Sequence, residues 1–307
     1  MEFNVAPAVD RDRMLPAGIW GLLATPFNAD GSAVDIASLT RLVESYLPLN
    51  LAGLTVLGVF GEAADLTPTE RREVVRIVHD LSPRTQLVVG VTSLSTEAAI
   101  DEIHNVADVG GDSITAYLVQ VNSSDPEAVI EHLTRIHAAT GGWVMAQDYP
   151  PITGVDITGP DLVQVIEACP FVCAVKLEAA PTPHKVAMLT SCSTVPVFGG
   201  LGASYLLDEL GCGGAGAMTG FTVPEGLIEC YEAYREGGFA AARAAWLPYL
   251  PLVNFEFQAG FARTIRKEGL KRRGLIDHAT SRTGSVVLTP EISELLDLHL
   301  ANTPHTA

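Results

Sequence analysis

The sequence predicts an α/β fold, a (β/α)8 barrel with a C-terminal helical extension, and three observations predict it. Short apolar, β-branched runs alternate with amphipathic stretches, which is the pattern of a parallel sheet covered by helices on both faces. Eight such runs precede residue 221, and eight strands close a barrel. An open doubly wound sheet is the structural alternative, but the first run lacks the glycine-rich phosphate turn that such sheets usually carry.

The elements follow in order along the chain. The eight expected strands lie within residues 18–27, 53–60, 86–93, 113–119, 143–148, 171–178, 195–200 and 214–220. Helical periodicity between them is clearest at 35–47, 67–81, 95–109, 125–139 and 161–169. Thr67 with Glu70, and Ser95 with Glu97, are signals of helix N-termini.

The chain changes character after the eighth run. Residues 228–275 show two or three helical stretches with no strand between them. We therefore expect residues 1–220 to form the barrel and residues 221–307 to form a helical extension packed on it, the two making a single structural unit.

Composition limits the function. The chain has 48% hydrophobic and 18% charged residues, with 19 basic against 36 acidic side chains and a net charge of −17. Such a chain can bury a large core, and its charge disfavours binding to nucleic acid or anionic membranes. No apolar run reaches the ~18 residues that span a bilayer, and the N-terminus lacks a signal-peptide pattern. We expect a cytoplasmic globular protein.

Metal-binding patterns are weak. The five cysteines are an odd number, and Cys169 and Cys173 form an isolated C-x3-C pair with no second pair or nearby histidine, a poor zinc signature. No histidines have the spacing of a zinc protease. We expect reduced thiols and no metal.

Lys176 is the strongest candidate for chemistry. It lies inside the apolar run FVCAVKLE, where an ammonium group costs several kcal/mol unless it is paired or neutralised. Strand alternation puts Lys176 and Glu178 on one side, at the strand end where barrel enzymes have their active sites. A desolvated lysine can attack a carbonyl and form a Schiff base. The alternative is a structural ion pair.

Three further segments end predicted strands. GVFGE (58–62) could hold a carboxylate with its backbone N–H groups, although glycines there often only make a turn. Gln147 and Asp148 precede two prolines, where a polar pair more often caps a loop. The glycines of 213–220 let the backbone approach closely, to line a site or to pack.

In this order, the segments resemble the dihydrodipicolinate synthase / N-acetylneuraminate lyase family of class I aldolases. The matching segments are ATPF (24–27) with DG (30–31), GVFGE, ITG (152–154), VKLE (175–178) and GAGAMTG (214–220), and the similarity spans about residues 16 to 300. The resemblance implies a barrel enzyme, a Schiff-base Lys176, pyruvate or another 2-keto acid as substrate, no metal or organic cofactor, and a homo-oligomer, a tetramer or dimer.

The resemblance also implies the site. Lys176, Glu178 and Gln147 are its catalytic candidates. The expected substrate-binding residues are Thr25, Phe60, Gly61, Glu62, Asp148, Gly200, Met218 and Thr219. Within this set, the Gly61–Glu62 backbone is expected to hold the substrate carboxylate.

Departures from the family pattern narrow the reaction. Most of the family has two threonines where this chain has Val59 and Phe60, and a strand-five tyrosine where it has Gln147. The tyrosine pair usual after strand four is also absent. We therefore expect the hydroxyl relay of aldol cleavage to be missing, which disfavours the lysine-biosynthesis enzyme and the sialic acid lyase.

The QD pair, the K-x-E arrangement, GAMTG (216–220) and AWLPYLPLVNFE (245–256) resemble the 2-keto-3-deoxy sugar acid dehydratases, in particular those of L-2-keto-3-deoxyarabonate. Dehydration needs a proton removed from C3 of the iminium and a proton delivered to the departing C4 hydroxyl. One mobile carboxylate can do both, and Glu178 is the candidate, with Gln147 orienting the substrate or the leaving water.

Two alternatives stay open. Val59, Phe60, Leu118 and Val119 predict an apolar pocket rim, which favours an aldolase or hydratase-aldolase for a less polar, aromatic adduct of pyruvate. A barrel that binds a keto acid without turnover is the non-enzymatic alternative, although the presence of both Lys176 and Glu178 argues against it.

Overall fold

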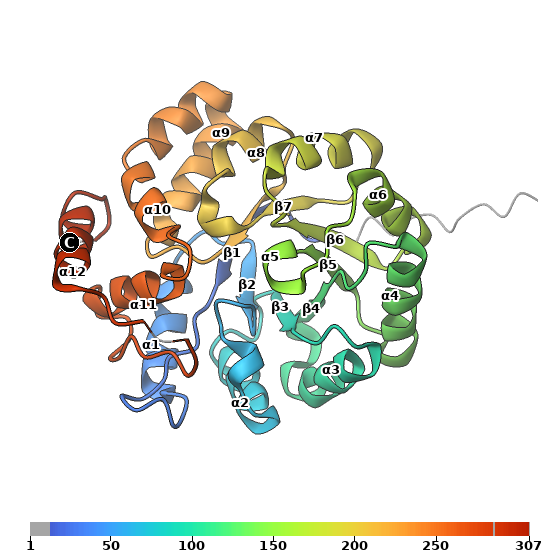
Figure 1. Cartoon of the computed structure of the whole chain (residues 1–307), viewed down its shortest axis with the longest axis horizontal. Helices are drawn as coiled ribbons and strands as arrows, with labels where there is room; N and C mark the ends of the chain where they lie inside the picture. The colour runs from blue at the N-terminus through green and yellow to red at the C-terminus, as the bar shows by residue number, and fades with distance from the viewer. Residues whose placement is uncertain (1–12, 285, 307) are drawn as a thin grey trace, which may run out of the picture.

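Eight parallel strands close into a barrel in chain order, β1 to β8, in the computed structural model, which describes residues 13–284 and 286–306 (Figure 1). The predicted fold class is confirmed, and each strand lies within its predicted run except β4, which extends one residue beyond the run 113–119. The strands are β1 Gly18–Leu22, β2 Gly53–Val56, β3 Leu87–Val91, β4 Ile114–Gln120, β5 Val144–Asp148, β6 Val172–Leu177, β7 Val197–Gly199 and β8 Gly216–Thr219. Residues 1–12, which include the N-terminal segment expected to lack a signal pattern, lie outside the described residues.

Helices surround the barrel (Figure 1). Those between strands are α1 Ile36–Tyr46, α2 Pro68–Leu81, α3 Thr96–Gly110, α4 Pro126–Thr140, α5 Pro150–Thr153, α6 Gly159–Ala168, α7 Thr182–Cys192 and α8 Leu206–Gly211, with short 3-10 turns η2 Ala63–Asp65, η3 Gly111–Ser113 and η4 Leu201–Ala203. Thr67 and Glu70 form the predicted capping box of α2. Ser95 is the N-cap of α3, but its side chain makes no capping bond to the helix backbone.

The sequence pattern does not single out α5, α7 or α8. The helix α5 is one turn that begins with two prolines, and α8 has only six residues. The helix α7 buries just Thr182, Val186 and Leu189, so its apolar stripe is too narrow to mark a helix in the sequence.

The C-terminal segment forms α9 Pro224–Trp246, α10 Leu250–Glu256, α11 Ala262–Arg272 and α12 Pro290–Ala301. The first three occupy the stretch for which the sequence predicts two or three helices. The helix α12 was not predicted. A hydrophobic cluster joins Trp246, Tyr249 and Leu252 of this segment to Ile19 of β1 and Ala217 of β8. We propose on this basis that residues 221–307 share one structural unit with the barrel.

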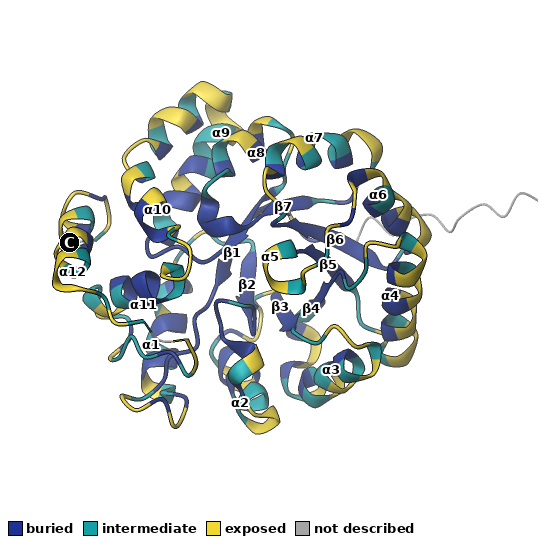
Figure 2. Cartoon of the chain, viewed as in Figure 1, coloured by how far each residue is buried: buried dark blue, intermediate teal, exposed yellow. Residues whose placement is uncertain are grey.

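The strands are buried almost throughout, as the dark blue barrel of Figure 2 shows. The pattern explains why the strands are near-continuous apolar runs, since a parallel sheet is covered on both faces. In the described ranges, no helix is both long enough and apolar enough to cross a membrane.

Strand register brings polar side chains to one level. Gln120 of β4 pairs with Gln147 of β5, and Gln147 pairs with Lys176 of β6. All three lie at or next to the carboxyl ends of their strands. The register therefore assembles residues separated by as many as 56 positions at one end of the barrel.

Candidate active site

A cavity of about 520 Å³ opens at the carboxyl ends of the strands. Lys176 of β6 and Thr219 of β8 contribute to its lining, with Glu178 just after β6. Loops after β2, β5 and β7 and residues between Phe257 and Arg266 form most of the remaining lining, to which Leu22, Gly220 and Gly284 also contribute. This is the end of a barrel where catalytic groups lie.

Lys176 and Glu178 face each other in this cavity. Lys176 Nζ lies 3.3 Å from Glu178 Oε2, and the two residues are only 4% and 6% exposed. An amine and a carboxylate at this distance can exchange a proton directly. The arrangement therefore joins a nucleophile to an acid–base group.

Two glutamines hold the carboxylate. Gln147 Nε2 donates to Glu178 Oε2, and Gln120 Nε2 donates to Gln147 Oε1 over 2.6 Å. Because Gln120 occupies the carbonyl oxygen of Gln147, the amide of Gln147 must present its donor to Glu178. Gln147 is 1% exposed and lies behind the carboxylate. Its expected contact with substrate or the leaving water is therefore indirect.

A tight turn after β7 holds Glu178 from the other side. The Leu201 N–H donates to Glu178 Oε1 over 3.3 Å, and the Gly202 N–H donates to Thr219 Oγ1 over 2.8 Å. Leu201 has a positive φ of 46°, which is uncommon for a leucine. Gly200 supports the carboxylate without entering the cavity lining, since a Cβ there would lie 2.4 Å from Glu178 Cγ.

Tyr149 also lines the cavity. The strand β5 carries Gln147 where most of the family has a tyrosine, but the chain turns after β5 and brings a tyrosine two positions later into the cavity. The absence of the hydroxyl relay of aldol cleavage stays a prediction. Burial raises the pKa of Tyr149 to about 12, with the Glu178 charge acting in the same direction. The YPP sequence directly after Asp148 was the available signal.

The glycine loop differs from the prediction at Glu62. Phe60 lines the cavity, but Glu62 is fully turned away and pairs with Lys267 of α11. The Glu62 N–H donates to the Val59 carbonyl over 3.1 Å, so it is already engaged. Thr25 supports the loop by donating to the Gly61 carbonyl over 2.6 Å.

Other predicted residues lie outside the cavity lining. Asp148 pairs with Lys185 of α7 at 2.5 Å, and burial raises the pKa of Asp148 against the attraction of that lysine. Met218 is fully buried in the core. Leu118 and Val119, expected at the rim, are also core residues, because β4 is covered on both faces.

Arginines from α11 were missed. Arg263 and Arg266 line the cavity, about 90 positions after Lys176 in the sequence. Sequence patterns within the barrel strands do not show that α11 packs close enough to place its arginines in the cavity. The single signal was the run of basic residues in a segment that follows the last strand.

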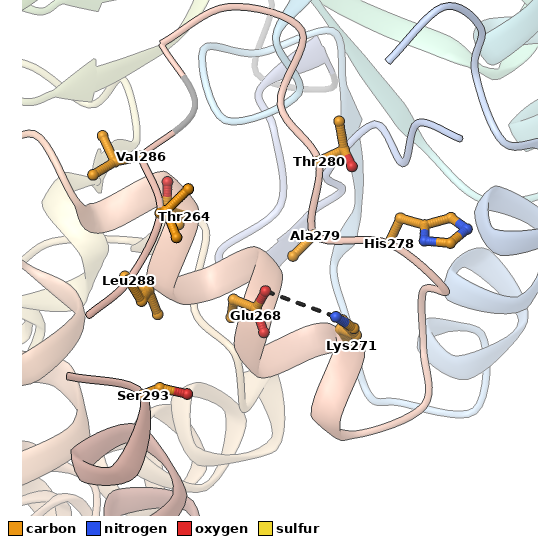
Figure 3. A pocket seen from close by; sticks show the side chains of 10 residues that line it. Thr264, Glu268, Lys271, His278, Ala279, Thr280, Val286, Leu288 and Ser293 are labelled. Atoms are coloured by element: carbon orange, nitrogen blue, oxygen red, sulfur yellow. Dashed lines mark ion pairs between the residues drawn. The ribbon is translucent and has the colours of Figure 1, made fainter. Parts of the chain in front are cut away.

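A second cavity of about 290 Å³ lies between α11 and the segment before α12 (Figure 3). Figure 3 shows Glu268 and Lys271 pointing toward one another, and their charged atoms are 3.9 Å apart. The side chain of Lys271 is 47% exposed. The desolvated nucleophile lies in the barrel cavity instead. Within residues 13–284 and 286–306, no cluster of three His, Cys, Asp or Glu side chains could hold a metal ion.

Comparisons with known proteins point to one family. Residues 15–300 match the model of the dihydrodipicolinate synthetase family. The chain is 29% identical over 262 residues to the L-2-keto-3-deoxyarabonate dehydratase of Azospirillum brasilense, covering 82% of this chain and 84% of the relative. It is 30% identical over 224 residues to a 4-hydroxy-tetrahydrodipicolinate synthase of Anaeromyxobacter sp. (strain Fw109-5), covering 72% and 75%.

Solved structures agree. Dihydrodipicolinate synthase from Rhodopseudomonas palustris superposes with a TM-score of 0.85 at 26% identity, over 93% of this chain and 97% of that one. A protein from Pseudomonas aeruginosa described as a putative dihydrodipicolinate synthetase superposes with a TM-score of 0.84 at 25% identity, over 93% of this chain and 99% of that one.

Proposed function

The chain belongs to the dihydrodipicolinate synthetase family and is a class I lyase that acts on a 2-keto acid through a Schiff base, and we propose that it dehydrates a 2-keto-3-deoxy acid. The observation that carries the proposal is the Glu178 carboxylate, held 3.3 Å from Lys176 Nζ by a buried amide. The likeness to the L-2-keto-3-deoxyarabonate dehydratase supports the same reaction.

The first step is imine formation. Glu178 takes a proton from the Lys176 ammonium group, and the free amine attacks the C2 carbonyl. Glu178 then returns that proton to the carbinolamine hydroxyl, which leaves as water, so that an iminium ion and a free Glu178 carboxylate remain. The positive charge of the iminium ion acts as the electron sink for the next step, and we propose that no metal or organic cofactor is required.

The second step is elimination. Glu178 removes a proton from C3 of the iminium to give an enamine, and then delivers that proton to the C4 hydroxyl as the C4–O bond breaks. Water leaves, a C3–C4 double bond forms, and hydrolysis of the imine releases the keto acid and Lys176. The carboxylate ends each cycle as it began, so one group serves both transfers.

The remaining roles follow from position. Gln147 holds Glu178 toward Lys176 by its amide donor. In the glycine loop, the Phe60 and Gly61 N–H groups make no hydrogen bond within the described ranges. We assign the C1 carboxylate of the substrate to these two groups, in place of the expected Gly61–Glu62 pair.

Glu178→Gln tests the proposal. The amide keeps the size of the side chain but carries no proton between C3 and C4, so turnover of 2-keto-3-deoxy acids should fall by roughly 10²- to 10⁴-fold. Borohydride should still trap a pyruvate adduct on Lys176 after long incubation. Dehydratase turnover at the wild-type rate in this variant would refute the assignment.

Tyr149 favours one other reaction. Its hydroxyl could serve as the base on the C4 hydroxyl that aldol cleavage requires, and the cavity lining includes Leu22, Val59 and Ile152, which suit a less polar adduct of pyruvate. Tyr149→Phe decides between the two. Dehydration should change by only a few-fold, whereas an aldolase should lose roughly 10²-fold or more. Product analysis with sugar-derived and aryl-substituted keto acids identifies which reaction is present.

A further inference from the structure

Arg266 enters the cavity from outside the barrel. Its residue is 9% exposed, it lines the cavity, and its guanidinium carbon lies 5.9 Å from the centre of the Phe60 ring. A Cβ on Gly202 would come within 2.1 Å of Arg266 Nη2. The guanidinium group therefore rests between the loop after β2 and the turn after β7.

One edge of the guanidinium group is anchored. Arg266 Nε donates to Glu256 Oε2 over 3.2 Å, and the Glu256 carboxylate is fully buried. Burial raises the pKa of Glu256, and the Arg266 charge opposes that rise. The anchor holds the guanidinium group at Nε, and Arg266 contributes to the lining of the cavity.

The two terminal nitrogens of Arg266 donate no hydrogen bond to any described residue. A planar fork of N–H donors fits a carboxylate with two parallel bonds. A buried guanidinium group whose terminal N–H groups have no partner is stabilised strongly by an anionic group of the ligand. The geometry thus prepares a site for a carboxylate.

The position of Arg266 indicates which carboxylate. In the proposed mechanism, the C1 carboxylate lies against the Phe60 and Gly61 N–H groups and Glu178 works at C3 and C4. Arg266 abuts Gly202, the residue after the one whose N–H binds Glu178. Arg266 therefore lies close to the group that acts at C3 and C4, within reach of the part of a longer substrate that extends beyond C4.

We propose that Arg266 binds a second carboxylate at the far end of the substrate, so that the enzyme selects dicarboxylic 2-keto acids. This inference rests on the proposed Lys176 imine and adds the substrate class. The cavity volume of about 520 Å³ accommodates such a ligand, because ligand pockets of roughly 300–1,000 Å³ bury molecules larger than pyruvate.

The test compares three probes that differ in the far end. These are pyruvate, 2-ketohexanoate and 2-ketoadipate, the last two of equal chain length with a methyl group or a carboxylate at the end. The measurement is the concentration of each that gives half-maximal borohydride-trapped adduct. Wild type should prefer 2-ketoadipate to 2-ketohexanoate by roughly 10- to 100-fold, the range expected of charge-assisted hydrogen bonds.

Variants isolate the guanidinium group. Arg266→Gln should abolish that preference and leave pyruvate and 2-ketohexanoate within about twofold of wild type, since neither reaches the fork. The double variant with Glu256→Gln replaces the buried ion pair by two amides and removes the unpaired carboxylate. It should give the same result if the single variant does not fold. Lys271→Gln, on the same helix but lining the second cavity, is the control and should behave as wild type.

Other outcomes would overturn the inference. Equal weakening of all three probes in R266Q would overturn the inference, because the three probes share only the C1 carboxylate and the C2 carbonyl, and pyruvate has no far end for Arg266 to bind. No adduct with any probe would refute the imine instead. In that case the rise in unfolding temperature caused by 2-ketoadipate can be compared with the rise caused by 2-ketohexanoate, in wild type and in R266Q. This comparison measures the preference for the far carboxylate and does not require an imine.

Discussion

Glu178 is restrained through both carboxylate oxygens. Lys176 and Gln147 contact Oε2, and the Leu201 N–H contacts Oε1. The backbone of Gly200 lies against the side chain so closely that no Cβ fits. A proton-transfer group in such a site gains its rate from position, and a displacement of about 1 Å can cost about 100-fold in rate.

Gly200→Ala should therefore reduce turnover by on the order of 100-fold, because the new Cβ must push Glu178 away from Lys176. The unfolding temperature should change little, since the adjustment occurs next to the cavity. Steady-state kinetics and thermal unfolding check the two parts. Gly211→Ala, whose new Cβ would meet only the side chain of the exposed Phe239, is the matched control, and an equal loss of rate there would contradict the account.

The site residues that could be predicted from the sequence are those whose type is unusual for their place in a barrel strand. Lys176 and Glu178 stand out because a charged pair inside an apolar run is unusual. Tyr149 and Arg266 carry only weak signals, the YPP sequence and a run of basic residues, because an aromatic residue after a strand and an arginine in a helix are ordinary. Glu62 was misassigned because its left-handed backbone, φ 53°, turns the side chain away from the cavity, and one-dimensional patterns do not report that turn.

At the scale of elements, α11 is fixed to the glycine loop by a buried ion pair. Lys267 and Glu62 are 0% exposed at their side chains, and Lys267 also donates to the Thr280 carbonyl over 2.7 Å. Burial lowers the pKa of Lys267 to about 8 against the attraction of Glu62. Glu62 Oε2 receives the Arg282 N–H over 3.1 Å. The contacts join α11, the loop after β2 and the segment after α11.

Lys267→Met should lower the free energy of unfolding by about 3–5 kcal/mol, because it leaves the Glu62 carboxylate buried without its main partner. Adding Glu62→Gln should recover much of that loss, since the second change removes the stranded charge. Urea unfolding measures both variants, with Lys271→Met on the exposed side of the same helix as control. If the double variant were no more stable than the single one, the ion pair would not be the cause.

The helix α8 carries another buried carboxylate. Glu209 accepts a hydrogen bond from Thr182 of α7, and burial raises the pKa of Glu209 from 4.5 to about 7. Between these two values the folded protein keeps Glu209 protonated while the unfolded chain ionises it. The stability that the protonated group contributes is therefore fully present below pH 4.5 and is lost as the pH rises toward 7.

Glu209→Gln should remove this pH dependence, because the amide stays neutral. Relative to wild type, the variant should gain stability between pH 5 and pH 8, by at most about 3 kcal/mol. Urea unfolding at the two pH values gives the difference. A constant difference between the two proteins across this range would show that Glu209 does not titrate there.

At the scale of the whole molecule, the topology was predictable and the completion of the site was not. Alternating strands and helices count out a closed barrel, and buried parallel strands are near-continuous apolar runs that the sequence displays. The helix α11 packs against the loop after β2 through a contact between residues more than 200 positions apart, Lys267 with Glu62. Contacts between residues so far apart produce no periodic pattern in a single sequence, so they could not be predicted from it.

The assembly of the molecule stays a prediction. The resemblance implies a homo-oligomer, a tetramer or dimer, and light scattering would determine the state. The cytoplasmic location expected from the composition also stays a prediction. The acidic balance, net −17, favours solubility, but it does not determine assembly.

The central claim is a covalent imine on Lys176, and intact-protein mass spectrometry after borohydride treatment tests it most directly. Wild type incubated with pyruvate should gain the mass of one reduced pyruvate adduct per chain. Lys176→Ala should gain none, and the untreated protein should keep its mass. An adduct that persists in the variant would place the chemistry on another amine, and no adduct in wild type with pyruvate or with longer 2-keto acids would contradict the Schiff-base mechanism.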